Sequence, residues 1–337
     1  MIGLKQKPLY DLTFVCRKGE NHFAQPILHE LKKRFSIQYL YPNHKRDYWH
    51  FQVKGKVIWV EWAHKFAHQV AKKKWEDKKV VVRFHRSEIL SRYMKMIKWK
   101  NIDHVIFVNS NFENEFRQKI SNNLLTSTIP NAIDVKAFPF EEPKSNKSIC
   151  VYGYGFNPIK GYDSLILFFH KLLNRDSEFH LTIMGMITKQ PSSKRQLKKI
   201  KEMIREIGIE EKITIIEKDL VDSLVKDREN VSQFLSRHEI ILSFSHVESF
   251  HYSFAEGLLC GLQGFYNQWH NPLIKEFWNP WGCSSEEDML KKIIHWSKLD
   301  LSAKKEITQR NRQYVLNNFG SQHIAKQYES LFFGAHS

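Results

Sequence analysis

The sequence predicts an α/β protein with two doubly wound parallel sheets, and three observations support this fold class. The chain has 337 residues, which is enough for about two domains of ordinary size. Short apolar runs alternate with helical patterns of about 10–15 residues throughout both halves. Apolar residues make up 42% and charged residues 26% of the chain, a globular composition that excludes a mostly disordered protein.

The first half contains five strand-like and four helix-like segments. We expect strands at 11–16, 37–41, 56–61, 80–85 and 104–108, and helices at 25–34, 65–75, 87–100 and 111–120. The strand segments are dense in Val, Ile and Phe, as is typical of strands buried on both faces of a parallel sheet. The helical segments place apolar residues at intervals of three and four.

The second half repeats this alternation. We expect strands at 148–152, 179–184, 213–216, 239–243 and 264–266, helices at 161–173, 194–207, 221–235, 254–261 and 286–297, and two more helices within 301–333. The segment 138–147 is polar, contains two prolines and begins no periodic pattern, so it is the predicted linker. These features predict Rossmann-like domains at 1–145 and 146–315, followed by a C-terminal segment at 316–337.

Positive charge is concentrated in the first half. The formal net charge of the chain is +16, and residues 1–145 hold 27 Lys and Arg against 14 Asp and Glu. This asymmetry predicts an anionic partner, which the sequence leaves open between nucleic acid, an acidic membrane surface and an anionic substrate. No helix-turn-helix, zinc-finger or RNP signature supports nucleic acid, which is therefore the weaker explanation.

Two basic helices in this half favour the membrane explanation. The expected helix 87–100 places its apolar residues on one face and its cations towards the other: Leu90, Tyr93, Met94 and Ile97 against Arg92, Lys95 and Lys98. Lys72, Lys73 and Lys74 cluster in the helix expected at 65–75. Such helices bind anionic membrane surfaces. We expect their apolar faces to pack on the protein's own sheet, and the sequence leaves open whether the cations are attracted to a membrane or simply solvated.

Other classes of protein are less consistent with the sequence. No run of about 18 apolar residues is present to span a membrane, and the first 15 residues lack the apolar region of a signal peptide. The four cysteines are scattered, which favours a reducing cytosol and a role in the core. No HExxH or Asp-x-Asp pattern occurs. We therefore expect a cytoplasmic protein without a metal ion or other cofactor.

The most informative segment is HVESFHYSFAEGLLCGL at 246–262. Glu248 lies in a loop after a predicted strand, and Glu256 lies eight positions later in a predicted helix. Open α/β sheets bind ligands at the carboxyl ends of their strands, and helix N-termini favour phosphate. Carboxylates beside these amides can accept hydrogen bonds from sugar or ribose hydroxyls.

This segment resembles the Glu-x7-Glu motif of the retaining GT-B-fold glycosyltransferases of family 4. Further motifs of that family are resembled in the same order by HVIFVNS (104–110), IPNAIDVKAF (129–138), VYGYGFNPIKGYDSLILFFHKLL (151–173), FHLTIMGM (179–186) and the helices at 306–333. CRKGENHFAQPILHEL (16–31) is loosely similar to the family's first Gly-rich loop. The resemblance implies two Rossmann-like domains facing a cleft, with the C-terminal helix crossing back to the N-terminal domain.

The resemblance also implies roles for individual residues. Glu248 and His85 are the expected catalytic residues, close to the donor sugar. Donor binding is expected at Arg17, Lys18, Gly19, Gly153, Tyr154, Lys160, Ser249, Phe250, His251, Tyr252 and Glu256. Among these, Lys160 is expected to pair with the diphosphate and Glu256 to bind the nucleotide ribose. Tyr154 stands where the family has Arg, and His251 adds a side chain near the sugar where Gly is usual.

The resemblance implies a metal-independent, retaining transferase that moves a sugar from a nucleotide-sugar to a saccharide or lipid-linked saccharide in glycan or cell-envelope polysaccharide biosynthesis. The N-terminal domain is expected to hold the acceptor, and the basic half to be attracted to the inner face of the cytoplasmic membrane. Two alternatives stay open. One is a nucleic-acid-binding protein that uses the basic half, and the other is a GT-B relative that binds its ligand without turnover.

Overall fold

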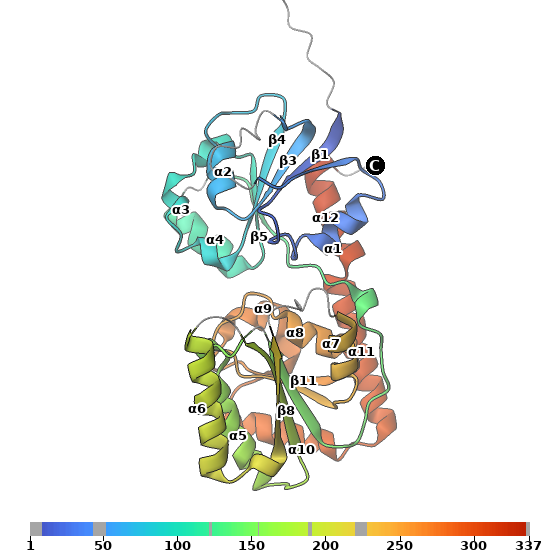
Figure 1. Ribbon diagram of the computed structural model, residues 1–337. Coiled ribbons are helices and arrows are strands. Elements are labelled where there is room, and N and C mark those ends of the chain that lie inside the picture. Colours follow the sequence, from blue (N-terminus) through green and yellow to red (C-terminus); the bar gives the residue numbers. More distant parts are fainter. Residues whose placement is uncertain are drawn as a thin grey trace, which may run out of the picture. The chain divides into compact units, whose positions relative to one another are not determined.

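A computed structural model describes residues 9–42, 52–120, 123–153, 155–187, 191–219 and 228–334. Contacts divide the chain into two compact units, one of Met1–Ile133 with Phe319–Ser337 and the other of Asp134–Asn318. Each unit contains one six-stranded sheet with helices on both faces, and all the strand pairings between described residues are parallel (Figure 1). The predicted α/β class with two doubly wound parallel sheets is confirmed.

The first sheet has the strand order β2-β1-β3-β4-β5-β6. Its strands are β1 (Tyr10–Val15), β2 (Ile37–Leu40), β3 (Gly55–Glu61), β4 (Lys79–Phe84), β5 (His104–Phe107) and β6 (Thr126–Thr128). The direction of winding reverses between β1 and β3, which are neighbours in the sheet. The five predicted strands all occur within one residue of their expected bounds, whereas β6 was not predicted because its three polar residues form no apolar run.

Helices cover both faces of this sheet (Figure 1). They are α1 (Gln25–Leu31), α2 (Lys65–Val70), α3 (Tyr93–Met96), α4 (Ser110–Lys119) and α12 (Ser321–Phe333). The C-terminal α12 lies beside α1 on one face, where Tyr328 and Phe332 pack with Leu12 and Trp59 in a buried cluster. Segments far apart in the sequence thus share one core.

The predicted continuous helix at 87–100 is wrong. The segment is divided among the 3-10 turn η2 (Arg86–Glu88), α3, and the 3-10 turn η3 (Trp99–Asn101). The buried carboxylate of Glu88 accepts hydrogen bonds from the backbone N–H groups of His85 (3.1 Å) and Ala63 (3.0 Å), which fixes a tight turn directly after β4. The expected apolar face is therefore broken, and Leu90 is 89% exposed.

The helix predicted at 65–75 is also shorter than expected. It ends as α2 at Val70, and Ala71 forms its C-cap. Lys72, Lys73 and Lys74 follow the helix as exposed residues of the next turn. The three lysines consequently form no polar face of a helix, although they remain a local cluster of positive charge.

The second sheet has the strand order β12-β11-β10-β7-β8-β9. Its strands are β7 (Ser148–Gly153), β8 (His180–Ile187), β9 (Ile213–Asp219), β10 (Ile240–Ser243), β11 (Gln263–Asn267) and β12 (Gly282–Cys283). Counted along the chain this is the order 3-2-1-4-5-6 of dinucleotide-binding sheets, and its winding reverses between β7 and β10. The five predicted strands are present, and the two-residue β12 was not predicted.

The helices of this unit are α5 (Tyr162–Leu173), α6 (Pro191–Ile207), α7 (Arg228–Leu235), α8 (Tyr252–Leu259), α9 (Lys275–Trp278), α10 (Glu286–Ser297) and α11 (Leu301–Phe319). The helix predicted at 221–235 corresponds to α7 in its described part, and residues 220–227 lie outside the described residues. The first residue of α8 is Tyr252, two positions before the predicted start.

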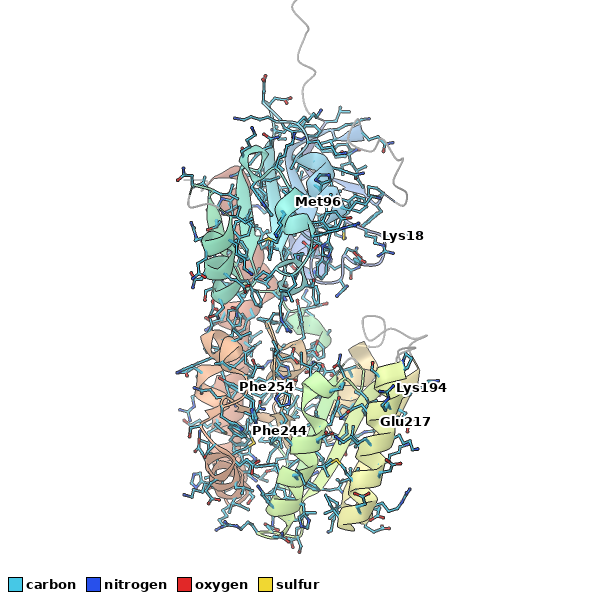
Figure 2. The ribbon with its side chains drawn as sticks, turned by 90° about the vertical axis from the view of Figure 1, so that its left-hand side faces the viewer. Lys18, Met96, Lys194, Glu217, Phe244 and Phe254 are labelled. Carbon is cyan, nitrogen blue, oxygen red and sulfur yellow. The ribbon has the colours of Figure 1, made fainter. Side chains whose placement is uncertain are left out.

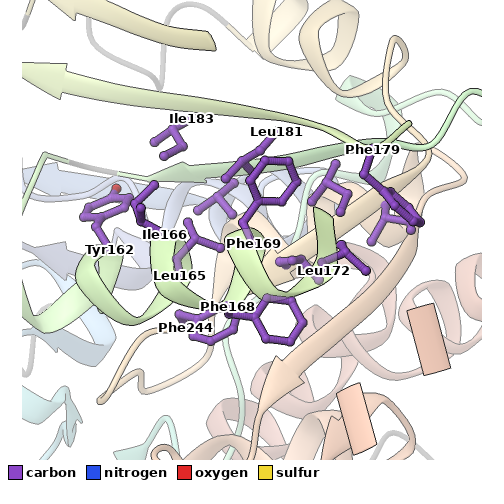
Figure 3. Close-up of a cluster of buried hydrophobic side chains, with 14 of the residues drawn as sticks. Tyr162, Leu165, Ile166, Phe168, Phe169, Leu172, Phe179, Leu181, Ile183 and Phe244 are labelled. Carbon is purple, nitrogen blue, oxygen red and sulfur yellow. The ribbon is translucent and has the colours of Figure 1, made fainter. Parts of the chain in front are cut away.

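A large apolar core fixes α5 against this sheet (Figure 3). Phe169 and Leu172 of α5 pack with Leu181 of β8, and Phe168 contacts Phe244 at a ring-centroid separation of 5.0 Å. Because Phe244 begins the loop after β10, this core also anchors that loop. The four cysteines are buried and unpaired, so their predicted role in the core is confirmed.

The polar segment after Ile133 packs within the second unit. Glu239, which is 2% exposed, accepts hydrogen bonds from the backbone N–H groups of Asn146 (3.1 Å) and Lys147 (2.8 Å). The same carboxylate forms a 2.7 Å ion pair with the fully buried Lys304 of α11. These charge-assisted hydrogen bonds offset the free-energy cost of burying the polar groups of this segment.

Candidate functional site

The carboxyl ends of β7 and β10 form the candidate site of the second unit. These strands are neighbours, and the chain leaves them towards opposite sides of the sheet. A crevice forms at such a reversal in open α/β sheets, and ligands bind there. The segment after β7 leads to Lys160, and the loop after β10 contains Glu248.

A short turn presents Lys160. Within η5 (Pro158–Lys160) the side chain of Asn157 accepts a hydrogen bond from the N–H of Ile159 (3.1 Å). Gly161 follows in the left-handed conformation, at φ +67°. A Cβ atom at Gly161 would lie 2.1 Å from the carbonyl oxygen of Phe244, so this position requires glycine both for its backbone angle and for its packing.

The loop after β10 is tied to this turn. The N–H of His246 donates to the carbonyl of Ile159 (2.8 Å), and the side-chain amide of Asn267 donates to the carbonyl of Phe244 (2.9 Å). Phe250 is buried against Trp278, with ring centroids 5.6 Å apart. The loop is thus held at both ends, and Glu248 and Ser249 between them are half-buried.

Lys160 and Glu248 form an ion pair across this reversal point, although 88 positions separate them in the sequence. Their Nζ and Oε1 atoms are 2.5 Å apart, and the side chains remain 22% and 16% exposed. The nearest heavy atom to a Cβ built at Gly153 is Cε of Lys160, at 3.7 Å. Three residues of the predicted site are therefore close together.

Electrostatics hold Glu248 ionised. Burial by itself raises the pKa of its carboxyl, but the ammonium of Lys160 and then the imidazole of His251 outweigh that effect and bring the pKa to about 2. A carboxylate in this state is only an acceptor of hydrogen bonds, so it suits a ligand that presents hydroxyl groups.

His251 lies inside the loop. It has φ +74°, a left-handed conformation that is uncommon for a residue with a side chain. One ring nitrogen, Nε2, lies 2.5 Å from Oγ of Ser243, and the other lies 3.1 Å from Oγ of Ser253. Burial lowers the pKa of the imidazole to about 4, so it is neutral at pH 7. The two nitrogens thus contact the strand before the loop and the helix after it, which indicates a role in fixing the shape of the loop.

Glu256 lies in the second turn of α8. It is half-buried, and burial raises the pKa of its carboxyl to about 8. Among the described residues, its carboxyl has no hydrogen-bond or ion-pair partner. Tyr252 is half-buried at the first position of the helix, and Tyr154 lies outside the described residues.

The first unit contains the remaining predicted site residues. Arg17, Lys18 and Gly19 lie in the exposed loop after β1 (Figure 2), where Arg17 pairs with Glu20 at 3.0 Å. Gly19 has φ +85°, and open space surrounds the position of a Cβ. These residues are placed for contact with solvent or a ligand.

His85, at the end of β4, is 5% exposed. Its Nε2 lies 2.9 Å from Oε1 of Glu61, and burial lowers the pKa of the imidazole to about 4. The neutral ring therefore donates its Nε2–H to the carboxylate. Trp62 stacks on the ring at a centroid separation of 4.0 Å, so little of His85 faces solvent.

Sequence reasoning missed the buried ion pair beneath this ring. Arg83 and Glu61 are opposite each other in the register of β4 and β3, are fully buried, and lie 3.1 Å apart. Arg83 also donates to the side chain of Asn131. The available signal was a charged residue directly after the apolar run of each strand, at Glu61 and at Arg83, because a buried charge needs a partner of opposite sign.

The part of the chain that the structure describes contains neither a cluster of metal ligands nor a membrane-spanning helix. Within it, no group of three or more His, Cys, Asp and Glu side chains is arranged to hold a metal ion. None of its helices is both long enough and apolar enough to cross a membrane.

Known proteins resemble this chain in their fold but not in their sequence. No protein-family model matches the sequence, and no curated protein sequence matches it. Solved structures do match it along almost its whole length. Sucrose-phosphate synthase from Thermosynechococcus elongatus has a TM-score of 0.70 at 13% identity, with 96% of this chain and 98% of that chain covered.

Two further structures show the same relationship. HepE from Anabaena, solved with UDP and glucose, has a TM-score of 0.68 at 13% identity and covers 97% of this chain and 100% of its own. A glycosyltransferase from Rickettsia africae has a TM-score of 0.67 at 16% identity and covers 96% and 97%. The chain has the GT-B fold. At identities this low, the structural similarity establishes only a common fold. The activity of this protein has to be argued from its site.

Proposed function

We propose that this protein is a glycosyltransferase that takes a sugar from a nucleotide-sugar and transfers it to a saccharide or lipid-linked saccharide. The observation that carries the proposal is the partly exposed Lys160–Glu248 pair at the reversal point of the second sheet. It combines a cation for phosphate with a carboxylate for hydroxyls in one place. A nucleotide-sugar presents both groups next to each other.

Lys160 and two helix N-termini supply the charge that a diphosphate needs. Lys160 lies just before α5, whose N-cap is Gly161 and which has no side-chain cap, and α8 begins beside the same loop, also without one. The first amides of a helix and its dipole stabilise anions. We propose that these groups balance the charge that develops on the leaving diphosphate, so that the transfer needs no metal ion.

Glu248 is proposed to bind the hydroxyls of the donor sugar. Its carboxylate forms an ion pair with Lys160. When a diphosphate takes over Lys160, the ionised carboxylate becomes available to the sugar hydroxyls. Glu256 is proposed to accept hydrogen bonds from the ribose, consistent with a half-buried carboxyl that has no partner among the described residues.

Three features of the proposal come from the resemblance to family 4: retention of configuration, contact of His85 with the sugar, and contact of the loop at Arg17, Lys18 and Gly19 with the donor phosphates. His85 acts in this proposal as a neutral group, because the pKa of its imidazole is lowered by burial to about 4. Product stereochemistry, measured by NMR of the transferred sugar, tests retention.

A surface of the first unit supports attraction to an anionic membrane, which we propose for the acceptor side. Leu90 is 89% exposed and Met96, labelled in Figure 2, is 44% exposed. The exposed cations Arg92, Lys95 and Lys98 belong to the same segment of the chain. The only acidic residue from 86 to 100, Glu88, is fully buried. Each cation near an anionic leaflet contributes about 1 kcal/mol, so this surface has the charge that peripheral binding needs.

Vesicle binding tests the membrane proposal. Replacing Arg92, Lys95 and Lys98 together by Glu should reduce sedimentation with phosphatidylserine vesicles, because an attraction to the leaflet becomes a repulsion. Sedimentation with uncharged phosphatidylcholine vesicles is the control. Unchanged sedimentation of the triple variant with phosphatidylserine would contradict a role of this surface.

The central test uses ligand binding first and transfer second. A thermal-shift screen with UDP, GDP, ADP and their sugar conjugates should identify the donor, because ligands of the folded state raise its melting temperature. The Glu248→Gln variant should then bind the free nucleotide normally but transfer about 100-fold more slowly. Glu286→Gln, which removes the half-buried partner of Lys171 elsewhere in the unit, is the matched control and should behave as wild type.

Glu256→Gln tests the role of Glu256 separately from that of Glu248. It should weaken binding of the ribonucleotide and leave binding of the matching 2′-deoxy and 3′-deoxy nucleotides nearly unchanged. Full transfer by Glu248→Gln would overturn the site assignment. Nucleotide binding by the wild type without transfer to any acceptor would instead favour a binding-only relative.

A further inference from the structure

The carboxyl edge of the first sheet carries a continuous series of aromatic rings. In order of contact the rings are His22, Phe23, His85, Trp62, His64 and Tyr93, and successive ring centroids lie 3.9, 5.3, 4.0, 6.1 and 6.1 Å apart. They come from the loops after β1, β3 and β4 and from α3. All except His85 are half-buried, so the series lies at the surface and not in the core.

This series lies where the winding of the first sheet reverses, between β1 and β3. Ligands of open α/β sheets bind at such points. The ionic group below the rings, Arg83 with Glu61, is fully buried and paired. The charges of Arg83 and Glu61 therefore cancel beneath the rings. The rings present a ligand with an aromatic surface that has polar ring edges.

Trp62 is the residue whose conformation needs an explanation beyond packing. Its φ is +72°, in the left-handed region that is unfavourable for a bulky residue. Three contacts hold it there: its Nε1–H donates to the carbonyl of Glu20 (2.9 Å), the ring stacks on His85, and the N–H of Ala63 is fixed by Glu88 (3.0 Å). Strain maintained in this way is found most often at binding sites.

We propose that Trp62 and the rings beside it form a stacking subsite for a neutral saccharide ring, which is the acceptor if the proposed transferase function is correct. One face of a pyranose carries C–H groups that pack against the electron-rich face of an aromatic ring. Its hydroxyls project from the rim, where neutral imidazoles offer one donor and one acceptor each. Because the indole is already immobilised, little conformational freedom is lost on binding.

The histidines of the series support a neutral ligand. Burial lowers the pKa of both His22 and His64, so both rings are uncharged at pH 7. Glu20, the acidic residue of the first loop, is paired with Arg17. Cations lie at both ends of the series: Arg17 and Lys18 are in the loop that carries His22, and the guanidinium of Arg92 lies 5.3 Å from the centroid of the Tyr93 ring.

The experiment measures saccharide binding and nucleotide binding separately on the full chain. Glucose, N-acetylglucosamine and maltose serve as probes in saturation-transfer NMR, and the nucleotide identified by thermal shift serves as the second ligand. Trp62→Gly removes the ring while accommodating the left-handed backbone, and Trp62→Phe retains a ring. Trp75→Phe, in the same unit and also half-buried, is the matched control.

Trp62→Gly should weaken saccharide binding, or raise the acceptor KM, about tenfold. Trp62→Phe should have a smaller effect, Trp75→Phe none, and nucleotide affinity should stay at the wild-type value in all three. Equal loss of saccharide and nucleotide affinity in Trp62→Gly, unchanged saccharide affinity, or no binding of any probe by the wild type would each overturn the subsite. Saccharide binding that depends on Trp62 in a protein that binds no nucleotide would overturn the transferase proposal and leave the subsite standing.

Discussion

The carboxyl edges of the two sheets carry similar charges in opposite environments. In the first unit, Arg83 and Glu61 are completely buried and are covered by stacked rings. In the second, Lys160 and Glu248 form a similarly close pair but remain 22% and 16% exposed. Buried pairs stabilise a fold only as long as both partners are present. A pair that keeps contact with water can exchange its partner for a ligand. The same two types of charge therefore support a surface in one unit and form the proposed donor site in the other.

Removing the cation of each pair should give the largest difference in stability between the two units. Arg83→Met leaves Glu61 buried without its charge partner and should lower the free energy of unfolding by about 3–5 kcal/mol. Lys160→Met should cost about 1 kcal/mol or less, because water can solvate Glu248. Urea unfolding followed by circular dichroism measures both. Equal losses would show that exposure does not distinguish the two pairs.

Two glycines with positive φ sharpen the comparison. Gly161→Ala must accept both a left-handed backbone and a Cβ that would lie 2.1 Å from the carbonyl oxygen of Phe244. We expect a loss of about 2–4 kcal/mol. Gly19→Ala meets open space and should lose only the backbone part, about 1 kcal/mol. Melting temperatures compare the two variants, and a Gly161→Ala protein as stable as Gly19→Ala would refute the close approach.

The pH dependence should be similar at the two sites. Burial lowers the pKa of both His85 and His251 to about 4, below the ordinary 6.5 of the unfolded chain. The unfolded chain consequently binds more protons between pH 6.5 and 4, so stability is lost as the pH falls through that window. Each histidine should remove about 2 kcal/mol between pH 7 and pH 5.

Replacing each histidine by Gln isolates its share. Urea unfolding of His85→Gln and His251→Gln at pH 7 and pH 5 should show a smaller acid destabilisation than the wild type. The half-buried His238, whose pKa burial also lowers to about 4, is unchanged in both variants and should contribute the same acid destabilisation to each. Identical pH slopes for wild type and variants would contradict the assignment.

Much of the fold could be predicted because parallel strands are buried on both faces and consist of apolar runs. The strands at residues 10–15 and 79–84 are predicted within one residue in this way. The β6 and β12 strands were not predicted because they have only three and two residues respectively, too few to form an apolar run. The helix expected at 87–100 failed for a different reason: the carboxylate of Glu88 binds backbone N–H groups of two separate loops, a contact that local periodicity does not contain.

The candidate site shows the same division. Glu248 and Lys160 are predicted from separate motifs, and folding brings their charged atoms within 2.5 Å of each other. Trp62 is not predicted, because a single Trp after an apolar strand is ordinary in a sequence. Its backbone angle and its stacking on His85 are consequences of contacts made by Glu20 and Glu88, which lie far from it along the chain.

The sequence by itself determined the α/β class, the alternation of strands and helices and the residue types at the carboxyl edges, because these depend on local composition and periodicity. Tertiary structure alone decided which charges are buried and which face water. It placed Arg83 opposite Glu61 through strand register, and Lys160 beside Glu248 through the order of strands in a sheet. The burial of a charge depends on neighbours from distant segments of the chain. A buried pair can only stabilise the fold, whereas a pair that stays in contact with water is also accessible to a ligand.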